Sequence, residues 1–228
     1  MAEMENNHLN ARQDEPSRIV VLISGSGSNM QAIAESCAKK EINADIVGVI
    51  SNRPDVLGLE RAEQLELTTA VVDHTEYATR EEFDVHMMRA IDEYSPDLVV
   101  LAGFMRILTP DFVRRYRGRL LNIHPSLLPK YKGLHTHQRA LEAGDDEHGV
   151  TVHFVTEDLD GGPNAIQAVV KVLDDDSPTS LQQRVQQQEH VIYPIAVKWF
   201  VEGRLSMNKG DVYLDDQILP ESGVQLRS

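Results

Sequence analysis

The chain has 228 residues, of which 41% are hydrophobic and 25% charged, a composition typical of a globular protein with one sizeable core. Its formal net charge of −14 argues against a nucleic-acid partner, since phosphate backbones require a concentrated basic surface. No apolar run reaches the length of a membrane span, the first 18 residues lack a signal-peptide core, and the single cysteine, Cys37, cannot form an intrachain disulfide. We therefore expect a cytoplasmic protein without a membrane partner.

The first 17 residues are polar and show no apolar periodicity, so we predict a flexible N-terminal tail. Beyond them the predicted strands are 19–24, 45–50, 69–73 and 98–103, and the predicted helices are 29–40, 57–65 and a third from residue 79 onward. Thr79 and Glu82 form a capping-box pattern at the start of that third helix. Strands that alternate with helices at this spacing indicate right-handed βαβ units in a parallel sheet with helices on both faces.

The second half of the chain has a different pattern. After a short helix near Pro110, the predicted strands are 120–124, 150–155 and 165–172, and they follow one another without a long helix, which indicates an antiparallel extension of the sheet. Ser177 and Pro178 are start signals of a long helix with Pro194 as a bend, and a hairpin around 215–216 precedes a polar tail at 221–228. We predict one α/β domain over 18–220, with a Rossmann-like, mostly parallel twisted sheet and an antiparallel C-terminal extension.

A glycine-rich loop, Ser24-Gly25-Ser26-Gly27-Ser28-Asn29, lies between the first strand and the first helix, where backbone N–H groups can hold a phosphate. A dinucleotide site is disfavoured, because Met30 takes the third glycine position and the second strand ends in Ser51-Asn52 without an acidic residue. The chain also has no G-K-[ST] triphosphate motif. Two interpretations remain equally open: a monophosphate site formed by Gly27, Ser28 and Asn29, or a tight turn with Asn29 as helix cap.

Asn122 and His124 lie two positions apart in a strand, so their side chains share one face. The glycine-rich segment 158–163 carries Asp160, a carboxylate that could orient the imidazole, although Asp160 could equally be a turn residue and Asp158 competes for the role. An amide donor beside an imidazole and a carboxylate suits addition at a carbonyl carbon. We see no covalent nucleophile, since Ser126 lacks a nucleophile elbow, and we therefore expect direct transfer between two substrates.

Two further groups of residues lie outside this set. The segment 103–108 leaves the predicted strand 98–103 at its carboxyl end, where open α/β sheets bind ligands; it suits a flat heteroaromatic ring or simply packs onto the core. Four histidines fit no metal-ligand spacing, and we interpret them as loop and surface residues rather than metal ligands: His135, His137, His148 and His153.

The sequence resembles the phosphoribosylglycinamide formyltransferase family over about residues 18–220. The matching segments include Ile-Ser-Gly-x-Gly-Ser-Asn, Leu-Ala-Gly-Phe-Met-Arg-Ile-Leu, Leu-Leu-Asn-Ile-His-Pro-Ser-Leu-Leu-Pro-Lys-Tyr, Leu-Asp-Gly-Gly-Pro and Gln-Glu-His-x-Ile-Tyr-Pro. The resemblance implies formyl transfer from 10-formyltetrahydrofolate, as co-substrate and without a metal, to the amine of glycinamide ribonucleotide in purine biosynthesis. It also implies a monomer or homodimer, with the ribonucleotide site in the N-terminal half and the folate site and catalytic loop in the C-terminal half.

The same resemblance implies roles for individual residues. The ribonucleotide would be bound by Gly27, Ser28, Asn29, Gln186, Gln187, Gln188 and Glu189. The folate site would be lined by Arg80, Met105, Arg106, Ile107, Leu108, Asn122, Thr156, Glu157, Asp158, Leu159 and Asp160. The catalytic residues would be Asn122, His124 and Asp160, with Asn122 and protonated His124 stabilising the oxyanion and Asp160 orienting His124.

Three alternatives remain beside this interpretation. A formyltetrahydrofolate hydrolase shares the Asn, His and Asp chemistry but uses water as acceptor, and it would be expected to carry a regulatory domain before the catalytic one. A methionyl-tRNA formyltransferase would be expected to carry a further C-terminal domain and a basic surface. A folate- or phosphate-binding module without activity would not need the three polar residues of the catalytic set.

Overall fold

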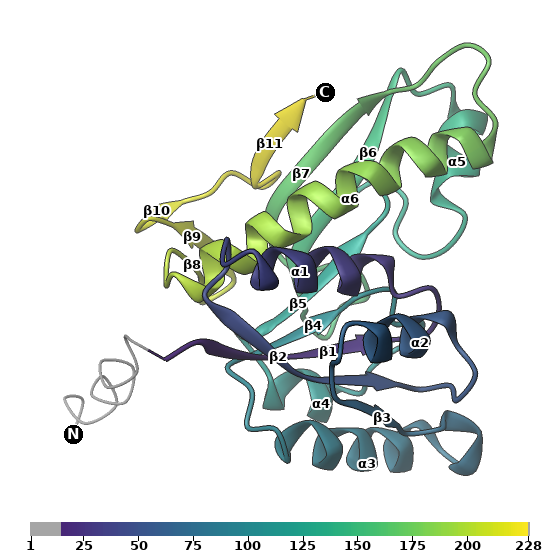
Figure 1. The fold of residues 1–228 in the computed structure, drawn as a ribbon. Helices are drawn as coiled ribbons and strands as arrows, with labels where there is room; N and C mark the ends of the chain where they lie inside the picture. The colour runs from purple at the N-terminus through teal and green to yellow at the C-terminus, as the bar shows by residue number, and fades with distance from the viewer. Residues whose placement is uncertain (1–14, 228) are drawn as a thin grey trace.

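The computed structural model of the chain describes residues 15–227. Residues 1–14 of the predicted tail therefore lie outside the described residues. The described part contains a central sheet of eight strands in the order β11-β7-β6-β5-β4-β1-β2-β3 (Figure 1). Five adjacent strands of this sheet are joined by parallel pairing: β1 (Ser17–Ile23), β2 (Ala44–Ser51), β3 (Thr69–Val71), β4 (Leu98–Leu101) and β5 (Leu120–His124). Ser17, which the prediction assigned to the tail, belongs to β1.

The order of the parallel strands creates the place where a ligand can bind. From β1 the chain proceeds outward to β2 and β3, and it then crosses to the other side of β1 to form β4 and β5. The loops that follow β1 and β4 therefore turn away from each other at the carboxyl edge of the sheet. In open α/β sheets such a switch point leaves a crevice for ligands.

The predicted antiparallel extension is confirmed by β6 (Glu147–Phe154), which pairs antiparallel with β5 on one side and with β7 (Asn164–Lys171) on the other. The predicted C-terminal tail is wrong for Val224–Arg227, because these residues form strand β11 and pair parallel with β7. Val224 and Leu226 pack against the core, but alternation over only four residues was too short to signal a strand.

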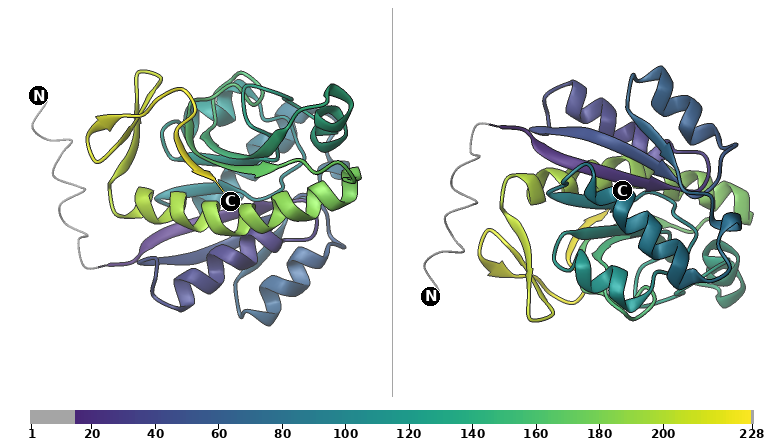
Figure 2. Two further views of the ribbon diagram at one scale, coloured as in Figure 1. Left: turned by 90° about the horizontal axis from the view of Figure 1, so that it is seen from above. Right: turned by 90° about the horizontal axis from the view of Figure 1, so that it is seen from below.

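Helices cover both faces of the sheet, as predicted (Figure 2). One face carries α1 (Ser28–Ala38), α2 (Leu57–Gln64), α5 (Thr136–Ala143) and α6 (Pro178–Val201), and the other carries α3 (Arg80–Asp92) and α4 (Pro110–Arg115). In β1, Ile19, Val21 and Ile23 face the first layer, and Val20 and Leu22 face the second, so both faces are apolar. Burial on both sides explains why the parallel strands read as continuous apolar runs.

The remaining elements lie outside the central sheet. They are the short 3₁₀ helix η1 (His74–Glu76) and a three-stranded antiparallel sheet of β8 (Leu205–Asn208), β9 (Asp211–Leu214) and β10 (Gln217–Ile218), which confirms the predicted hairpin. Helix α5 was not predicted; it is short, and its N-cap His135 is left-handed with no side-chain cap. No helix in the described part of the chain is both long and apolar enough to cross a membrane.

Candidate active site

Asn122 and His124 lie at the end of β5 and share one face, as the spacing predicted. Their neighbours Leu121 and Ile123 belong to the apolar layer beneath α1 and α6, on the opposite face. His124 is buried and Asn122 half-buried. The apolar residues thus fix the strand register, and the register aims the amide and the imidazole in the same direction.

Asp160 reaches His124 from the loop between β6 and β7. The Nδ1 atom of His124 lies 3.4 Å from Oδ2 of Asp160, and both side chains are more than 90% buried. On the other side of the ring, Nε2 lies 2.9 Å from the carbonyl oxygen of Tyr131, and the backbone N–H of Gly133 donates to the same Asp160 oxygen at 2.9 Å. Both ring nitrogens therefore face oxygen acceptors, an arrangement that an imidazolium ring satisfies completely.

Two glycines allow the Asp160 loop to take this path. Asp160 itself has a left-handed backbone, with φ at 46°, and Gly161 N–H donates to the carbonyl of Asp158. A Cβ on Gly162 would lie 1.8 Å from the carbonyl oxygen of Phe154, so only glycine can pack this closely against the end of β6. The Asp-Gly-Gly sequence is therefore a requirement of the backbone at this turn.

His153 is part of this site, although sequence reasoning placed it among loop and surface histidines. It is 2% exposed in β6, directly opposite Asn122 in the register, and its Nε2 lies 3.1 Å from Nδ2 of Asn122. Its Nδ1 donates to the carbonyl of Phe154 at 2.9 Å, so Nε2 is left to accept a proton from the amide. Burial lowers the pKa of His153, which keeps the ring neutral.

The four polar side chains form one linked set. Nε2 of His153 accepts from Asn122 and lies 4.0 Å from Oδ1 of Asp160, without a hydrogen bond because this nitrogen carries no proton, while Oδ2 of Asp160 contacts His124. His153 belongs to the site because it lies in β6 opposite Asn122. The sequence alone does not show this, because it does not give the pairing of β6 with β5.

His148 and His137 are not loop or surface residues either, contrary to the prediction. His148 is 1% exposed in β6, and its Nε2 lies 3.2 Å from Nδ1 of the half-buried His137 in α5. Of the four histidines interpreted as loop and surface residues, only His135 is exposed. Within residues 15–227 no group of three or more His, Cys, Asp or Glu side chains could hold a metal ion.

The predicted ribonucleotide loop forms the start of α1. Gly27 is its N-cap with a left-handed φ of 72°, and Ser28 is the first helical residue. Helix α6 packs here: Gln186 donates to the hydroxyl of Ser28 at 3.2 Å, and Asn29 donates to Glu189 at 2.7 Å. Burial raises the pKa of Glu189. The structure thus unites the loop with a segment 160 residues later in the chain.

Helical spacing divides the predicted run on α6. Gln186 and Glu189 are three residues apart and meet α1, whereas Gln187 is exposed and both Gln187 and Gln188 lie on other sides of the helix. Sequence reasoning also missed Gly58 at the start of α2. A Cβ on Gly27 would lie 2.6 Å from Cα of Gly58, whose N–H donates to the carbonyl of Gly25 at 2.9 Å, so Gly58 supports the loop from beneath.

The residues expected at the folate site lie in two segments on the α3 and α4 side of the sheet. Arg80, Met105, Arg106 and Ile107 line a cavity of about 340 Å³, and Met105 and Ile107 are 62% and 58% exposed. Leu108 packs against the core of this layer. The surface is therefore an exposed apolar ledge with two guanidinium groups.

The second segment, residues 156–160, leads to the catalytic carboxylate. Leu159 is 54% exposed, an apolar side chain available to a ligand. Glu157 forms an ion pair with Arg114 of α4 at 2.9 Å, so its carboxylate serves a contact within the protein. Thr156 is half-buried and Asp158 is exposed. The structure thus shows a protein partner for the carboxylate of Glu157 and an open apolar surface at Leu159.

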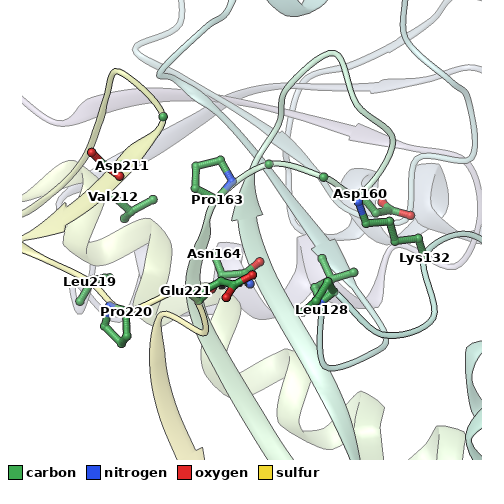
Figure 3. A pocket seen from close by; sticks show the side chains of 14 residues that line it. Leu128, Lys132, Asp160, Pro163, Asn164, Asp211, Val212, Leu219, Pro220 and Glu221 are labelled. Carbon is green, nitrogen blue, oxygen red and sulfur yellow. Dashed lines mark hydrogen bonds between the residues drawn. The ribbon is translucent and has the colours of Figure 1, made fainter.

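Another cavity of about 340 Å³ reaches Asp160 from the side of the C-terminal sheet. Figure 3 shows Asp160 and Lys132 on one side of it and Asp211, Val212, Leu219 and Pro220 on the other. Neither Asn122 nor His124 lines this cavity. The cavity therefore reaches the catalytic loop at Asp160 without including the strand residues Asn122 and His124.

Comparison with known proteins identifies the family. The family model described as formyl transferase matches residues 17–197. Phosphoribosylglycinamide formyltransferase of Escherichia coli (strain K12) is 55% identical over 205 residues, which cover 90% of this chain and 97% of that protein. The phosphoribosylglycinamide formyltransferase structure from Coxiella burnetii, in complex with CHES, is 50% identical with a TM-score of 0.88, covering 92% of this chain and 99% of that one. Glycinamide ribonucleotide transformylase 1 from Symbiobacterium toebii is 42% identical with a TM-score of 0.86, covering 89% and 95%. The chain belongs to the formyl transferase family and, within it, to the phosphoribosylglycinamide formyltransferases.

Proposed function

We propose that this chain transfers the formyl group of 10-formyltetrahydrofolate to the amine of N1-(5-phospho-D-ribosyl)glycinamide. The products would be formylglycinamide ribonucleotide and tetrahydrofolate, in de novo purine biosynthesis. The observation that carries the proposal is the linked set Asn122, His153, Asp160 and His124, in a chain 55% identical to an enzyme named for this activity. This set offers an amide and an imidazole as donors to a developing oxyanion, with a carboxylate that orients the imidazole.

The chemistry follows from the donors at the end of β5. The ribonucleotide amine attacks the formyl carbon, a C–N bond forms, and the formyl oxygen gains negative charge. Asn122 uses one amide proton for His153 and keeps the other for this oxygen, and His124 supplies a second donor. The tetrahedral intermediate then breaks the bond to N10 of the folate, and the proton lost by the amine passes to N10. Much of the acceleration comes from holding two substrates together.

The Nε2 proton of His124 is donated to the carbonyl oxygen of Tyr131 in this structure. A formyl oxygen needs the same donor. We therefore propose that the bound formyl donor displaces the Tyr131 carbonyl and takes its place on the ring, while Asp160 continues to hold Nδ1 on the other side.

The binding residues divide between the two loops at the switch point. Gly27, Ser28 and Asn29 offer backbone N–H groups at the start of an α-helix, where the helix dipole favours a phosphate. On α6, Gln186 and Glu189 lie beside them and suit ribose hydroxyls. The ledge formed by Arg80 and Met105–Leu108 suits the ring and the carboxylates of a folate.

One assay separates the possible activities. The protein is supplied with 10-formyltetrahydrofolate, with and without the ribonucleotide, and loss of the formyl donor is followed. Formyl transfer predicts loss only when the ribonucleotide is present. Loss without it would indicate hydrolysis with water as acceptor, and no loss in either case would contradict both activities.

We also propose a cytoplasmic protein that is a monomer or a homodimer. A single cysteine in 228 residues supports a reducing compartment. Light scattering of the purified protein at several concentrations distinguishes the two assembly states.

A further inference from the structure

Buried side chains from two other elements hold both ends of the loop Met105–Leu108, which connects β4 to α4. The loop forms neither helix nor strand. Its first N–H, that of Met105, donates to the hydroxyl of Ser24 at 2.7 Å, and the N–H of Thr109, directly after the loop, donates to Oδ2 of Asp84 at 2.6 Å. The position of the loop therefore depends on these two acceptors.

Ser24 holds the first end of the loop. It follows β1, is 5% exposed, and donates its hydroxyl proton to Oδ1 of Asn52 at 2.6 Å. Because that proton is committed to Asn52, an oxygen lone pair of Ser24 is directed to the N–H of Met105. Asn52, which is 1% exposed, follows β2, so the contact joins the ends of three neighbouring parallel strands, β4, β1 and β2.

Asp84 holds the second end. It lies in α3, is 0% exposed, and accepts from Thr109, whose hydroxyl in turn caps α4 by accepting from Phe112. Its neighbour Phe83 lies beneath the guanidinium group of Arg106, at 5.5 Å from the ring centre. Helix α3 therefore supports the loop twice, once by a hydrogen bond and once by an aromatic ring.

We propose that Ser24 and Asp84 are positioning residues that fix the two ends of the Met105–Leu108 loop, and that affinity for the formyl donor depends on this clamp. The inference rests on the proposed function, since it takes the loop as part of the donor site. Both side chains are buried beneath the loop, so they act through the backbone of Met105 and Thr109. Ser24 also begins the Ser24–Asn29 segment, so one hydroxyl joins the loops of both substrates.

The first test is S24A. It removes one hydroxyl and leaves the Met105 N–H and the Asn52 carbonyl without their partner. Steady-state kinetics with each substrate varied should show KM for 10-formyltetrahydrofolate raised roughly five- to tenfold. KM for the ribonucleotide should change less than about twofold, because Gly25–Asn29 keeps its contacts with Gly58 and α6.

S51A is the matched control. Ser51 is 0% exposed at the same edge of the sheet, and like Ser24 it makes two hydrogen bonds, but both are to the backbone of Arg53 in its own strand end. This variant should leave KM for the formyl donor unchanged. If S51A raised it as much as S24A does, the effect would be a general loosening of the sheet edge and the clamp would be rejected.

The other end is tested by comparing D84A with D84N. Alanine removes the acceptor of the Thr109 N–H and should raise KM for the formyl donor roughly fivefold. Asparagine keeps an oxygen of the same shape and should restore most of the affinity. If D84A does not fold, the S24A and S51A pair and the D84N variant still decide. Unchanged donor KM in both S24A and D84A would overturn the inference.

Direct titration of tetrahydrofolate separates this inference from the proposed function. Calorimetry should show the Kd of S24A raised by the same factor as its donor KM. Wild-type protein that binds tetrahydrofolate without transferring formyl groups would contradict the proposed function, while the ratio of the two Kd values would still decide on the clamp. Wild-type protein that does not bind tetrahydrofolate would overturn both.

Discussion

The side chain of Asn122 is oriented by a histidine on the neighbouring strand β6. His153 gives its Nδ1 proton to the carbonyl of Phe154, so its Nε2 can only accept, and the amide group of Asn122 is the donor that it accepts from. A charged ring would offer no acceptor to that amide. The lowered pKa of His153, caused by burial, therefore maintains the orientation of Asn122 through the neutral pH range.

At Asp160, the substitution to asparagine should lower kcat by roughly 100- to 1,000-fold with little change in either KM. The amide keeps the shape of the side chain but loses the negative charge of the carboxylate. Oδ2 of that carboxylate lies 3.4 Å from Nδ1 of His124 and accepts from the N–H of Gly133. The measurement is single-turnover formyl transfer at saturating substrates. A kcat within about threefold of the wild-type value would remove Asp160 from the proposed mechanism.

Gly27 and Gly25 provide a matched pair of alanine substitutions. G27A should reduce the free energy of unfolding by roughly 1 to 3 kcal/mol, because its φ is 72° and a Cβ would lie 2.6 Å from Gly58. G25A should change it by less than about 0.5 kcal/mol, since nothing lies within 4 Å of its Cβ position. Urea denaturation measures both. Equal effects would contradict the close packing of the loop on α2.

At the scale of elements, α5 is joined to β6 by a pair of histidines, His137 and His148. Burial lowers the pKa of His148 to about 4, and the neighbouring His137 adds to this shift. Burial likewise lowers the pKa of His137. Both rings are therefore neutral when the contact is intact, and protonation opposes it. The contact between helix and sheet is thus sensitive to acid.

The unfolded chain binds a proton at His148 below about pH 6.5, whereas the folded protein does so only near pH 4. Folding therefore loses stability as the pH falls through this window. From pH 7 to pH 5 the contribution of His148 is about 2 kcal/mol of unfolding free energy. H148Q should remove this pH-dependent contribution to the free energy of unfolding, which urea denaturation at pH 7 and pH 5 measures. An unchanged difference between the two pH values in H148Q would contradict the assignment.

At the scale of the whole molecule, β11 returns the C-terminus to the central sheet and covers the edge of β7. Gly223, with a left-handed φ of 67°, approaches Ala165 so closely that a Cβ would lie 2.6 Å from its carbonyl. Asn164 donates to the carbonyl of Glu221, and Arg227 forms an ion pair with Glu147 of β6. Residues 221–227 are therefore part of the folded domain.

A chain shortened after Pro220 should lose roughly 2 to 4 kcal/mol of unfolding free energy, from the partly buried Val224 and Leu226 and the lost ladder of hydrogen bonds with β7. Urea denaturation of the full and the shortened chain measures the difference. A segment that was only a polar tail would leave the midpoint unchanged, and that result would contradict the role of β11.

Local patterns predicted most of the fold because each signal involves neighbouring residues. The alternation of strands and helices gave the parallel sheet. Thr79 caps α3 by accepting from the N–H of Glu82, as the motif indicated, but the Glu82 carboxylate accepts from the N–H of Ala78 and not from that of Thr79, so only half of the predicted capping box forms. The signals failed where elements are held by distant contacts. Helix α5 begins at an uncapped His135, and β11 has only four residues, so both depend on packing against α6 and β7.

By itself the sequence determined the residue types of the site and their local spacing: an amide and an imidazole on one face of β5, a carboxylate on a glycine-rich segment at Asp-Gly-Gly, and a glycine loop before α1. Tertiary structure alone decided that Asp160 meets His124, that His153 joins them, and that Glu189 meets Asn29 across 160 residues. The reason is physical. Periodicity and turn preferences act over a few residues, whereas strand pairing and helix packing bring together residues that are far apart in the sequence. The number of residues between two such groups does not tell how far apart they lie in space.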